Sequence, residues 1–301
     1  RNRRLPVRGA ALKNLYGWAF GYGPPHALAA FRIGFGTLSA LSLLTLFVAT
    51  FTEPALAWFG PAEARAFEPN PGLVLPRLTL LGPLGSIGAF RAVIALGTVA
   101  AIALAFGWRT RASAIVHALV VVTVAHRLPL AMMGADTVQR ICAIVLPFSA
   151  CGAVWSIDAR GRSVEEVPLW PQRLLQFQCA LIYGSTLLIK AQGETWRDGT
   201  ATWYPLRLQE FARFPLPEFV RSAGMSRVTT YGTLLVEFAL CALVWFRPWR
   251  TPVVIAGTLM HLFIDVAMNV PYFAFFMMAM YLLHFDGAEW RGFVARRGRA
   301  R

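Results

Sequence analysis

One lysine stands out among the residues that could do chemistry. The chain has 29 lysines and arginines, of which only Lys13 and Lys190 are lysine. Lys13 lies in a basic N-terminal segment, whereas Lys190 closes the apolar run LQFQCALIYGSTLLIK. Arginine stays protonated, but a desolvated lysine can lose its proton near neutral pH and act as a base. Lys190 is therefore a candidate catalytic residue; the alternative is a helix-end anchor that reaches the membrane interface.

A histidine and an aspartate form a second candidate pair. His261, Asp265 and Asn269 are spaced four residues apart, so a helix places them on one face. A carboxylate that orients an imidazole is a common arrangement for proton transfer. The spacing offers no third metal ligand and no HExxH motif, so we expect no metal here. His261 and Asp265 could support catalysis, or they could only form hydrogen bonds within a helical bundle.

Three further ionisable residues lie at predicted membrane depth, where such groups are costly and usually paired or functional. Asp136 and Arg140 are spaced i, i+4 at the start of an apolar run. They could be a helix cap with a salt bridge, or a site where arginine binds a substrate carboxylate. Glu237 has no partner on its own helix, which predicts an interhelical partner such as Arg32 or a protonated carboxyl group.

A polar turn follows Lys190. In Trp196-Arg197-Asp198-Gly199, tryptophan suits the headgroup level and glycine permits a sharp bend. We expect an Arg197–Asp198 pair to hold the ends of this turn. Non-helical backbone beside a membrane is tolerated where protein covers it, so the turn is a candidate lid over Lys190 that contributes to substrate binding.

Composition places these residues in a membrane protein. The 301-residue chain is 56% hydrophobic and only 15% charged, with a mean hydropathy of +0.52. Soluble domains carry about 25% charged residues. The net charge of +14 comes from arginines between apolar runs, which indicates topology and not a nucleic-acid partner. The four cysteines lie inside apolar runs without CxxC spacing, so redox catalysis is not expected.

We expect an all-α bundle of about eight transmembrane helices. The predicted spans are about 27–51, 87–106, 112–126, 137–155, 172–190, 228–246, 252–268 and 272–285. They form one transmembrane domain, 26–285, after a basic amphipathic interfacial segment, 1–25, that breaks at Gly23-Pro24-Pro25. A basic tail, 286–301, follows.

The positive-inside rule orients this bundle. The short connections with Arg109 and Arg111, with Arg160 and Arg162, and with Arg247 and Arg250 are placed inside by this rule. The predicted outer loops, about 52–86 and 127–136, carry few arginines. The exception is the outer loop 191–226, whose four arginines are diluted by four acidic residues. This pattern predicts that both termini are cytoplasmic and that Lys190 faces outward.

The motifs between the spans resemble one known family. The segments concerned are PLWPQRLLQFQ (168–178), LIYGSTLLIKAQGETWRDGTATWY (181–204), FGWRTR (106–111), HRLPLAMMGADTVQR (126–140), WSIDARG (155–161) and HLFIDVAMNVPYFAFFMMAMYLL (261–283). In content and order they resemble the HTTM (horizontally transferred transmembrane) domain. That domain is the membrane part of vitamin K-dependent γ-glutamyl carboxylase and of many bacterial relatives.

The resemblance implies an outer-face site that uses a reduced quinone. In the carboxylase, a membrane lysine acts with vitamin K hydroquinone to remove a proton from a peptide glutamate, to which carbon dioxide adds. Lys190 matches that lysine, although the carboxylase has adjacent lysines where this chain continues with Ala191. We also expect no large extramembrane region of the kind that binds the carboxylase substrate, so the resemblance does not imply glutamate carboxylation itself.

The resemblance also suggests the setting. We expect an integral protein of the bacterial cytoplasmic membrane that modifies or matures an exported peptide, with a reduced quinone such as vitamin K and without metal or nucleotide. Membrane lipids, a secreted peptide and an operon-encoded partner protein are the expected partners. The alternative is a non-catalytic membrane factor that binds a peptide or lipid for a partner.

Overall fold

The computed structural model describes residues 7–52, 86–127 and 132–299. Its regular secondary structure is helical apart from two short strands, β1 (Tyr22–Gly23) and β2 (Val167–Pro168), which pair antiparallel. The helices in the first half are α1 (Val7–Phe20), α2 (His26–Thr52), α4 (Ile87–Phe106), α5 (Thr110–Arg127), α6 (Gly134–Val145) and the 3₁₀ turn η4 (Leu146–Phe148). The second half contains α7 (Trp170–Gln192), α8 (Glu194–Arg197), η5 (Gln209–Phe211), η6 (Glu218–Arg221), α9 (Ala223–Ala242), α10 (Arg247–Ala267), α11 (Phe273–Tyr281), η7 (Leu282–His284) and α12 (Gly287–Arg299).

The all-α prediction is confirmed, and the chain is an integral membrane protein. Among the described residues, α2, α4, α7 and α10 are long and apolar enough to cross a bilayer. The helices α5, α6, α9 and α11 occupy the positions of the other four predicted spans. The count of eight crossings and the cytoplasmic position of the termini stay predictions.

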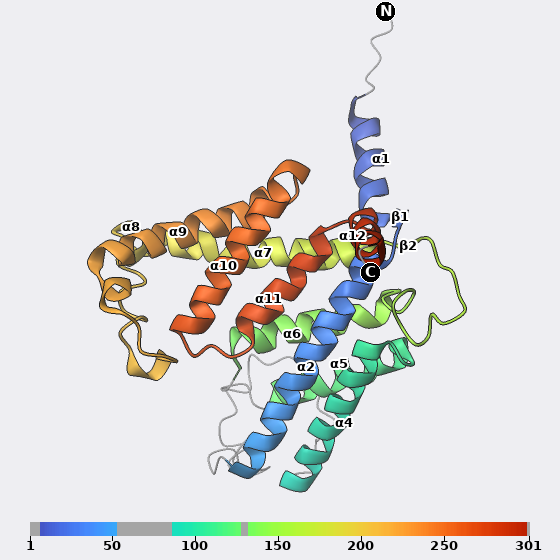
Figure 1. Ribbon diagram of the computed structural model, residues 1–301, viewed down its shortest axis with the longest axis horizontal. Coiled ribbons are helices and arrows are strands. Elements are labelled where there is room, and N and C mark those ends of the chain that lie inside the picture. The colour runs from blue at the N-terminus through green and yellow to red at the C-terminus, as the bar shows by residue number, and fades with distance from the viewer. Residues whose placement is uncertain (1–6, 53–85, 128–131, 300–301) are drawn as a thin grey trace, which may run out of the picture.

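The helix connections gather at two ends of the bundle (Figure 1). At one end, Ile157 donates its backbone N–H to Phe106, and Trp18 packs on Trp245. We call this the basic end; it contains residues 107–109, 149–169 and 243–246. At the other end, the backbone N–H of Asn269 donates to Phe211 over 2.7 Å. We call this the lid end; it contains residues 193–222 and 268–272.

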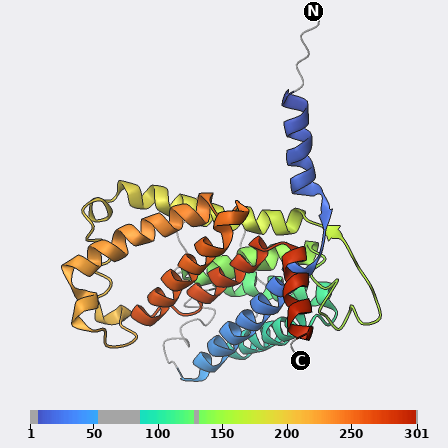
Figure 2. The same ribbon diagram turned by 45° about the horizontal axis from the view of Figure 1, so that its top comes forward.

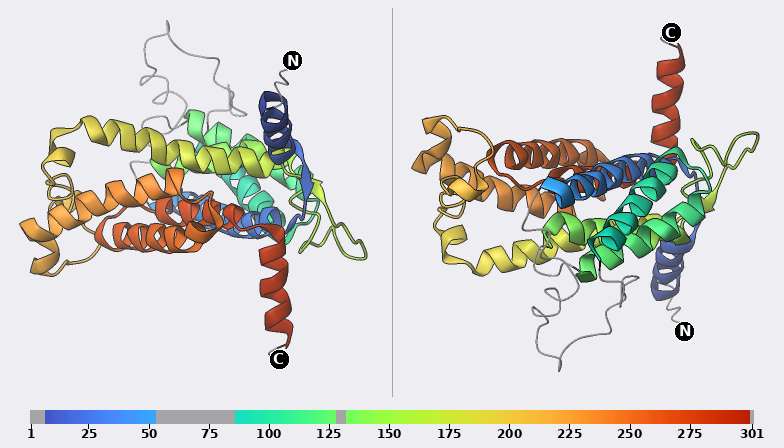
Figure 3. Two further views of the ribbon diagram at one scale, coloured as in Figure 1. Left: turned by 90° about the horizontal axis from the view of Figure 1, so that it is seen from above. Right: turned by 90° about the horizontal axis from the view of Figure 1, so that it is seen from below.

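The two terminal helices lie outside the bundle. Helix α1 runs away from it (Figure 2), and α1 and α12 project to opposite sides at the basic end (Figure 3). Side chains of α1 that expose large apolar groups include Leu15, Tyr16, Trp18 and Phe20. Such a helix is suited to the interfacial position predicted for residues 1–25.

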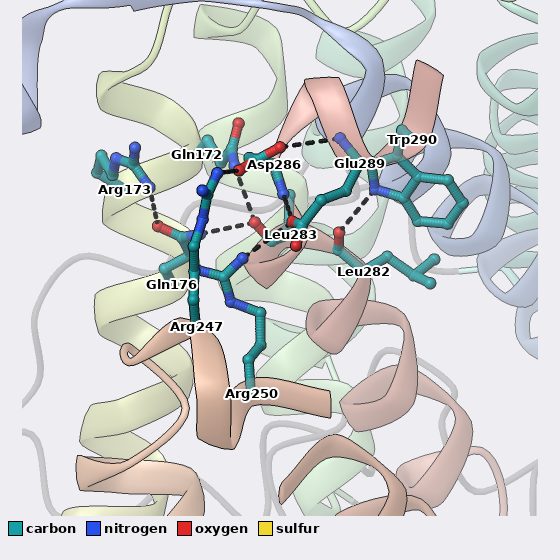
Figure 4. A network of polar contacts seen from close by, with 10 residues as sticks. All are labelled: Gln172, Arg173, Gln176, Arg247, Arg250, Leu282, Leu283, Asp286, Glu289 and Trp290. Atoms are coloured by element: carbon teal, nitrogen blue, oxygen red, sulfur yellow. Dashed lines mark hydrogen bonds and ion pairs between the residues drawn. The ribbon is translucent and has the colours of Figure 1, made fainter. Parts of the chain in front are cut away.

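Polar contacts tie α12 to the bundle (Figure 4). Arg247 forms a 2.5 Å ion pair with Asp286, and Arg250 forms a 2.9 Å ion pair with Glu289. Gln172 and Gln176 of α7 both donate to the Leu283 carbonyl, over 2.8 and 2.6 Å. These bonds satisfy a carbonyl group near the end of η7 that has no helical partner. They join α7, α10 and α12 at one level.

The predicted fourth span, 137–155, is wrong beyond Phe148. Helix α6 stops at Val145, and η4 contains Pro147, whose missing N–H cannot extend the ladder. The chain then folds back over the α4–α5 turn, where the Asp158 carboxylate accepts the backbone N–H groups of Arg109 and Thr110. Burial alone would raise the pKa of Asp158, but these hydrogen bonds outweigh it and lower the pKa. The predicted outer loop, about 52–86, falls almost entirely on residues 53–85, outside the described residues.

A buried arginine joins α2 to this connection. The Arg32 side chain is fully buried and donates to four backbone carbonyls, those of Cys151, Leu104, Ala105 and Trp155. Two of these carbonyls, those of Leu104 and Ala105, belong to the last turn of α4, where the Leu104 carbonyl also accepts the Gly107 N–H. Arg32 therefore closes the end of α4 and holds the following loop against α2.

Candidate functional site

Lys190 pairs with a carboxylate from another helix. It lies in the last turn of α7, and its Nζ donates to Oε1 of Glu237, in the second half of α9. The side chains are 22% and 9% exposed, respectively, so the pair is partly sheltered. The predicted partner of Glu237, Arg32, is wrong, because Arg32 binds only backbone carbonyls. Sequence spacing could not show this pairing, because the two residues are 47 positions apart.

An indole ring covers the same amine. The Trp196 ring centroid lies 4.8 Å from Lys190 Nζ, a distance at which a ring face stabilises a cation. Trp196 is on α8, which starts directly after Gly193, the residue that ends α7. The predicted interfacial turn therefore folds back over Lys190. The amine is enclosed between a carboxylate and an aromatic ring.

The predicted Arg197–Asp198 pair is wrong. Arg197 Nε donates to the Ala191 carbonyl over 3.0 Å, and Asp198 Oδ1 accepts the backbone and hydroxyl groups of Thr200. Each residue thus binds its local backbone or a neighbouring threonine. Gly199 has a φ of +81°, which favours glycine, and completes the turn.

The lid segment, residues 193–208, is fixed on the start of α9. Thr202 shares hydrogen bonds with Ser226, Thr229 and Thr230, and Tyr231 donates to the Arg197 carbonyl over 2.8 Å. Hydroxyl groups at this level replace the backbone partners that a loop beside a membrane needs. The lid segment is therefore attached to the helix that carries Glu237.

A buried hydroxyl–imidazole cluster lies deeper in the bundle. Tyr183 of α7 hydrogen-bonds through its hydroxyl group to His261 Nε2 of α10 over 2.8 Å, and also to the Tyr281 hydroxyl of α11. All three side chains are 3% exposed or less. A Cβ added to Gly257 would lie 2.9 Å from the Tyr281 hydroxyl, so glycine leaves room for it.

One face of α7 connects this cluster to Lys190. Tyr183, Thr186 and Lys190 are spaced i, i+3 and i+7, which places them along one helix face. The Thr186 hydroxyl, which has one proton to donate, lies 3.0 Å from the backbone carbonyl oxygens of Ile182 and Tyr183 and 3.4 Å from Glu237 Oε2. We call Tyr183, Thr186, Lys190, Glu237, His261 and Tyr281 the polar cluster. It comes from four helices and extends inward from the lid end.

The predicted His261–Asp265 couple is not formed. Asp265 instead makes a 2.7 Å ion pair with Arg213, which lies in the segment between α8 and α9. His261 Nδ1 and Asp265 Oδ1 are both buried, and neither has a hydrogen-bond partner among the described residues. Two unpartnered polar atoms on one helix face are positions where a polar ligand group or a water molecule can bind.

Asp136 and Arg140 lie elsewhere. Asp136 caps α6 by accepting the Met133 backbone N–H over 2.8 Å, and in the described part of the chain no ion pair joins it to Arg140. Arg140 lines a pocket between α5 and α6. Of the predicted site residues, the structure brings together Lys190, Glu237 and Trp196, with His261 next to them through Tyr183. It does not bring Asp136 and Arg140 to them.

Four residues of the site were not predicted from the sequence: Tyr183, Thr186, Arg213 and Tyr281. Tyr183 and Thr186 had a usable signal, because they share a helix face with Lys190. Tyr281 and Arg213 had none, since their partners come from distant segments. Among the described residues, no group of three or more His, Cys, Asp or Glu side chains could hold a metal ion.

Comparison with known families identifies the family to which this chain belongs. The family model of the HTTM domain matches residues 22–290, which include every member of the polar cluster. Searches of the curated proteins and of the solved structures found no match. Since the matched region covers most of the chain, the protein belongs to the HTTM domain family, a membrane family related to vitamin K-dependent carboxylases.

Proposed function

We propose that the protein is a membrane enzyme that uses Lys190 as a proton acceptor to modify or mature an exported peptide with a reduced quinone. The observation that carries this proposal is the Lys190–Glu237 pair beneath Trp196. Family membership supports carboxylase-like chemistry, and the pair supplies the groups that such chemistry needs.

The pair places two basic groups side by side. An amine and a carboxylate within reach of one bound acidic hydroxyl group are suited to general acid–base chemistry, in which one of them accepts the hydroxyl proton. Glu237 is more buried than Lys190, and its second oxygen lies 3.4 Å from the Thr186 hydroxyl. The carboxylate of α9 therefore faces two side chains of α7.

Deeper in the bundle, the polar cluster contains a second set of proton donors and acceptors. Tyr183 bonds to both His261 and Tyr281, and hydroxyl groups can donate and accept at the same time. His261 keeps its Nδ1 without a partner. The imidazole can therefore accept a hydrogen bond or a proton on the side that faces away from Tyr183.

The residues present fit a hydroquinone, which combines an aromatic ring with hydroxyl groups. Lys190 and Glu237 would bind one hydroxyl group, while unpartnered His261 Nδ1 and Asp265 Oδ1 offer acceptors for another. Trp196 and Phe273, whose ring centroid is 5.5 Å from that of His261, supply apolar surface. When bound, a reduced quinone would supply reducing equivalents and an acidic hydroxyl group.

Lysine chemistry is tested by replacing Lys190 with arginine. The purified protein in nanodiscs receives reduced vitamin K, dioxygen, bicarbonate and a glutamate-containing peptide, and the oxidation of the quinol by dioxygen and the incorporation of carbon dioxide are measured. Removing a general base typically lowers the rate about 10²–10⁴-fold, so we expect Lys190→Arg to lose at least about 100-fold. Glu237→Gln should also lose activity, because the carboxyl group can no longer take the proton.

The chain offers a matched control, since Lys13→Arg changes the other lysine, which is exposed on α1. That variant should keep full activity. Unchanged thermal stability of Lys190→Arg shows that the ion pair survives the substitution. A fully active Lys190→Arg variant refutes the role of the amine as proton acceptor.

A non-catalytic binding factor is the second candidate. It is favoured by the attachment of the lid segment to α9 through Thr202, because a fixed lid can present a binding surface without chemistry. This function is insensitive to Lys190→Arg. It requires residues 193–208, so their replacement by a short Gly/Ser linker would abolish capture of a partner.

A further inference from the structure

An apolar groove runs between α5 and α6, apart from the polar cluster. Its volume is about 640 Å³, and its lining is almost entirely apolar. Along α5 it extends from Ile115 to His126, and along α6 and η4 from Arg140 to Phe148. Lining residues on its rim, Ile115, Leu119, Ile144 and Phe148, are 44–63% exposed. The groove therefore opens outward, toward the lipid in a membrane-embedded bundle.

The groove matches the depth of one bilayer leaflet. From Ile115 to His126 the helix rises by 11 residues, about 17 Å at 1.5 Å per residue. One leaflet contributes about 15 Å of hydrocarbon, half of a core about 30 Å thick. The volume of the groove also falls within the range of ligand pockets, about 300–1,000 Å³. An extended acyl chain has the length and the polarity that this groove accepts.

A positive charge stands at one end of the groove. Arg140 is half-buried and, within the described residues, forms no hydrogen bond or ion pair. Asp136 acts on it only through space, since its carboxylate is used to cap α6. A guanidinium group at membrane depth is costly unless an anion compensates it. Arginine binds phosphate through two parallel hydrogen bonds.

The charged end of the groove is the lid end of the bundle. Gly134, the first residue of α6, packs against the ring of Phe273, which starts α11 directly after the lid-end connection 268–272. Arg140 is on the second turn of α6, close to that level. A headgroup bound by Arg140 would therefore lie in the leaflet next to the lid segment, and its chain would point toward the bilayer centre.

We propose that the α5–α6 groove is a specific site for an anionic phospholipid, which places one acyl chain along α5 and its headgroup phosphate on Arg140. This lipid is a resident ligand and not the substrate of the polar cluster. The site does not depend on the proposed enzyme activity, because none of its lining residues belongs to that cluster.

The test measures which lipid stays with the protein. The full chain is reconstituted in nanodiscs of phosphatidylcholine and phosphatidylglycerol with identical chains, then released into mild detergent for native mass spectrometry. We expect the wild type to retain one phosphatidylglycerol in preference to phosphatidylcholine. Arg140→Gln should lower that preference about 10-fold, as expected for loss of one charge-assisted contact. Arg140→Lys should keep part of it.

A second set of variants tests the position of the chain. Val122→Trp fills the groove, and Ile144→Trp replaces it if that variant does not fold. With either variant, neither phosphatidylglycerol nor phosphatidylcholine should be retained. The matched controls are Arg227→Gln, an exposed arginine on α9, and Val99→Trp, an exposed apolar position on α4. Both controls should retain phosphatidylglycerol like the wild type.

The outcomes separate the explanations. Equal retention of phosphatidylglycerol by Arg140→Gln and the wild type would overturn the headgroup assignment. Retention that survives both tryptophan variants would overturn the groove assignment. Displacement of the phospholipid by equimolar palmitate would show that a carboxylate amphiphile is the preferred ligand, which also overturns the proposal.

Discussion

Replacement of Arg32 should destabilise the bundle more than replacement of any exposed arginine. Its guanidinium group donates to four carbonyls at 2.6–3.0 Å, and the side chain is fully buried. A hydrogen bond to a charged group contributes about 1.5–3 kcal/mol, but bonds to one group are not additive. Disrupting a buried charged network typically costs about 3–5 kcal/mol. We therefore expect Arg32→Met to lower the free energy of unfolding by about 3–5 kcal/mol.

The assay is thermal unfolding in detergent, followed as loss of the monodisperse peak in size-exclusion chromatography. In chains of about 150–250 residues, 1 kcal/mol shifts Tm by about 2–4 °C, so the expected fall is about 6–20 °C. Arg32→Lys should recover only part of it, because one ammonium group cannot span four acceptors that a planar fork reaches.

Arg91→Met is the matched control for Arg32. Arg91 is less buried and hydrogen-bonds only to Thr50. Its loss should lower Tm by a smaller amount than the loss of Arg32. A change of less than about 2 °C in Arg32→Met would refute the reasoning, because it would mean that water or other donors replace the guanidinium group without cost.

Two further predictions concern packing and pH. Gly257→Ala should lower the free energy of unfolding by about 1–3 kcal/mol, because the added Cβ would lie 2.9 Å from both the Leu240 side chain and the Tyr281 hydroxyl. The measurement is the Tm, which should fall. An unchanged Tm would show that the neighbouring side chains move aside without cost. Burial alone would raise the pKa of Asp286, but a backbone hydrogen bond and the ion pair with Arg247 outweigh it and lower the pKa. The carboxylate therefore stabilises α12 docking above its unfolded pKa of about 3.9, and this contribution is lost as the pH falls through the lower folded value. Since the pair is largely exposed, we expect its contribution to α12 docking to be small. Its loss should be seen as faster hydrogen exchange in α12, below about pH 4 in the wild type and at all pH values in Asp286→Asn.

The sequence predicted most helices well because hydrophobic runs of spanning length have few alternatives. The span 87–106 coincides with α4, and 27–51 and 172–190 match α2 and α7 within two residues. Errors appear where hydropathy and local chemistry compete. Ser222 caps α9 and starts it about five residues before the predicted 228, because a serine hydroxyl that accepts the Met225 N–H outweighs the polar composition of that turn.

The candidate site was predictable only residue by residue. Lys190, Glu237, Trp196 and His261 could be selected because polar groups at membrane depth need a reason to be there. Their partners could not, since pairing depends on how α7, α9 and α10 pack. The i, i+4 spacing of His261 and Asp265 suggested a couple, yet Arg213, which comes from a distant segment, forms the ion pair with the carboxylate.

The identity of the residue at position 190 is the strongest argument that its pair with Glu237 does more than hold helices together. A purely structural ion pair would be served at least as well by arginine, whose planar fork binds both carboxylate oxygens. The chain uses arginine for all but two of its 29 basic residues, and Lys13 is the only other exception. What lysine alone offers here is an amine that can act as an acid or a base, which a guanidinium group cannot do. The same amine is covered by Trp196 and paired with Glu237, and seven residues away on the same face of α7 Tyr183 begins a buried cluster with His261 and Tyr281. A site that needed only charge would not require this environment, whereas a site that moves protons would.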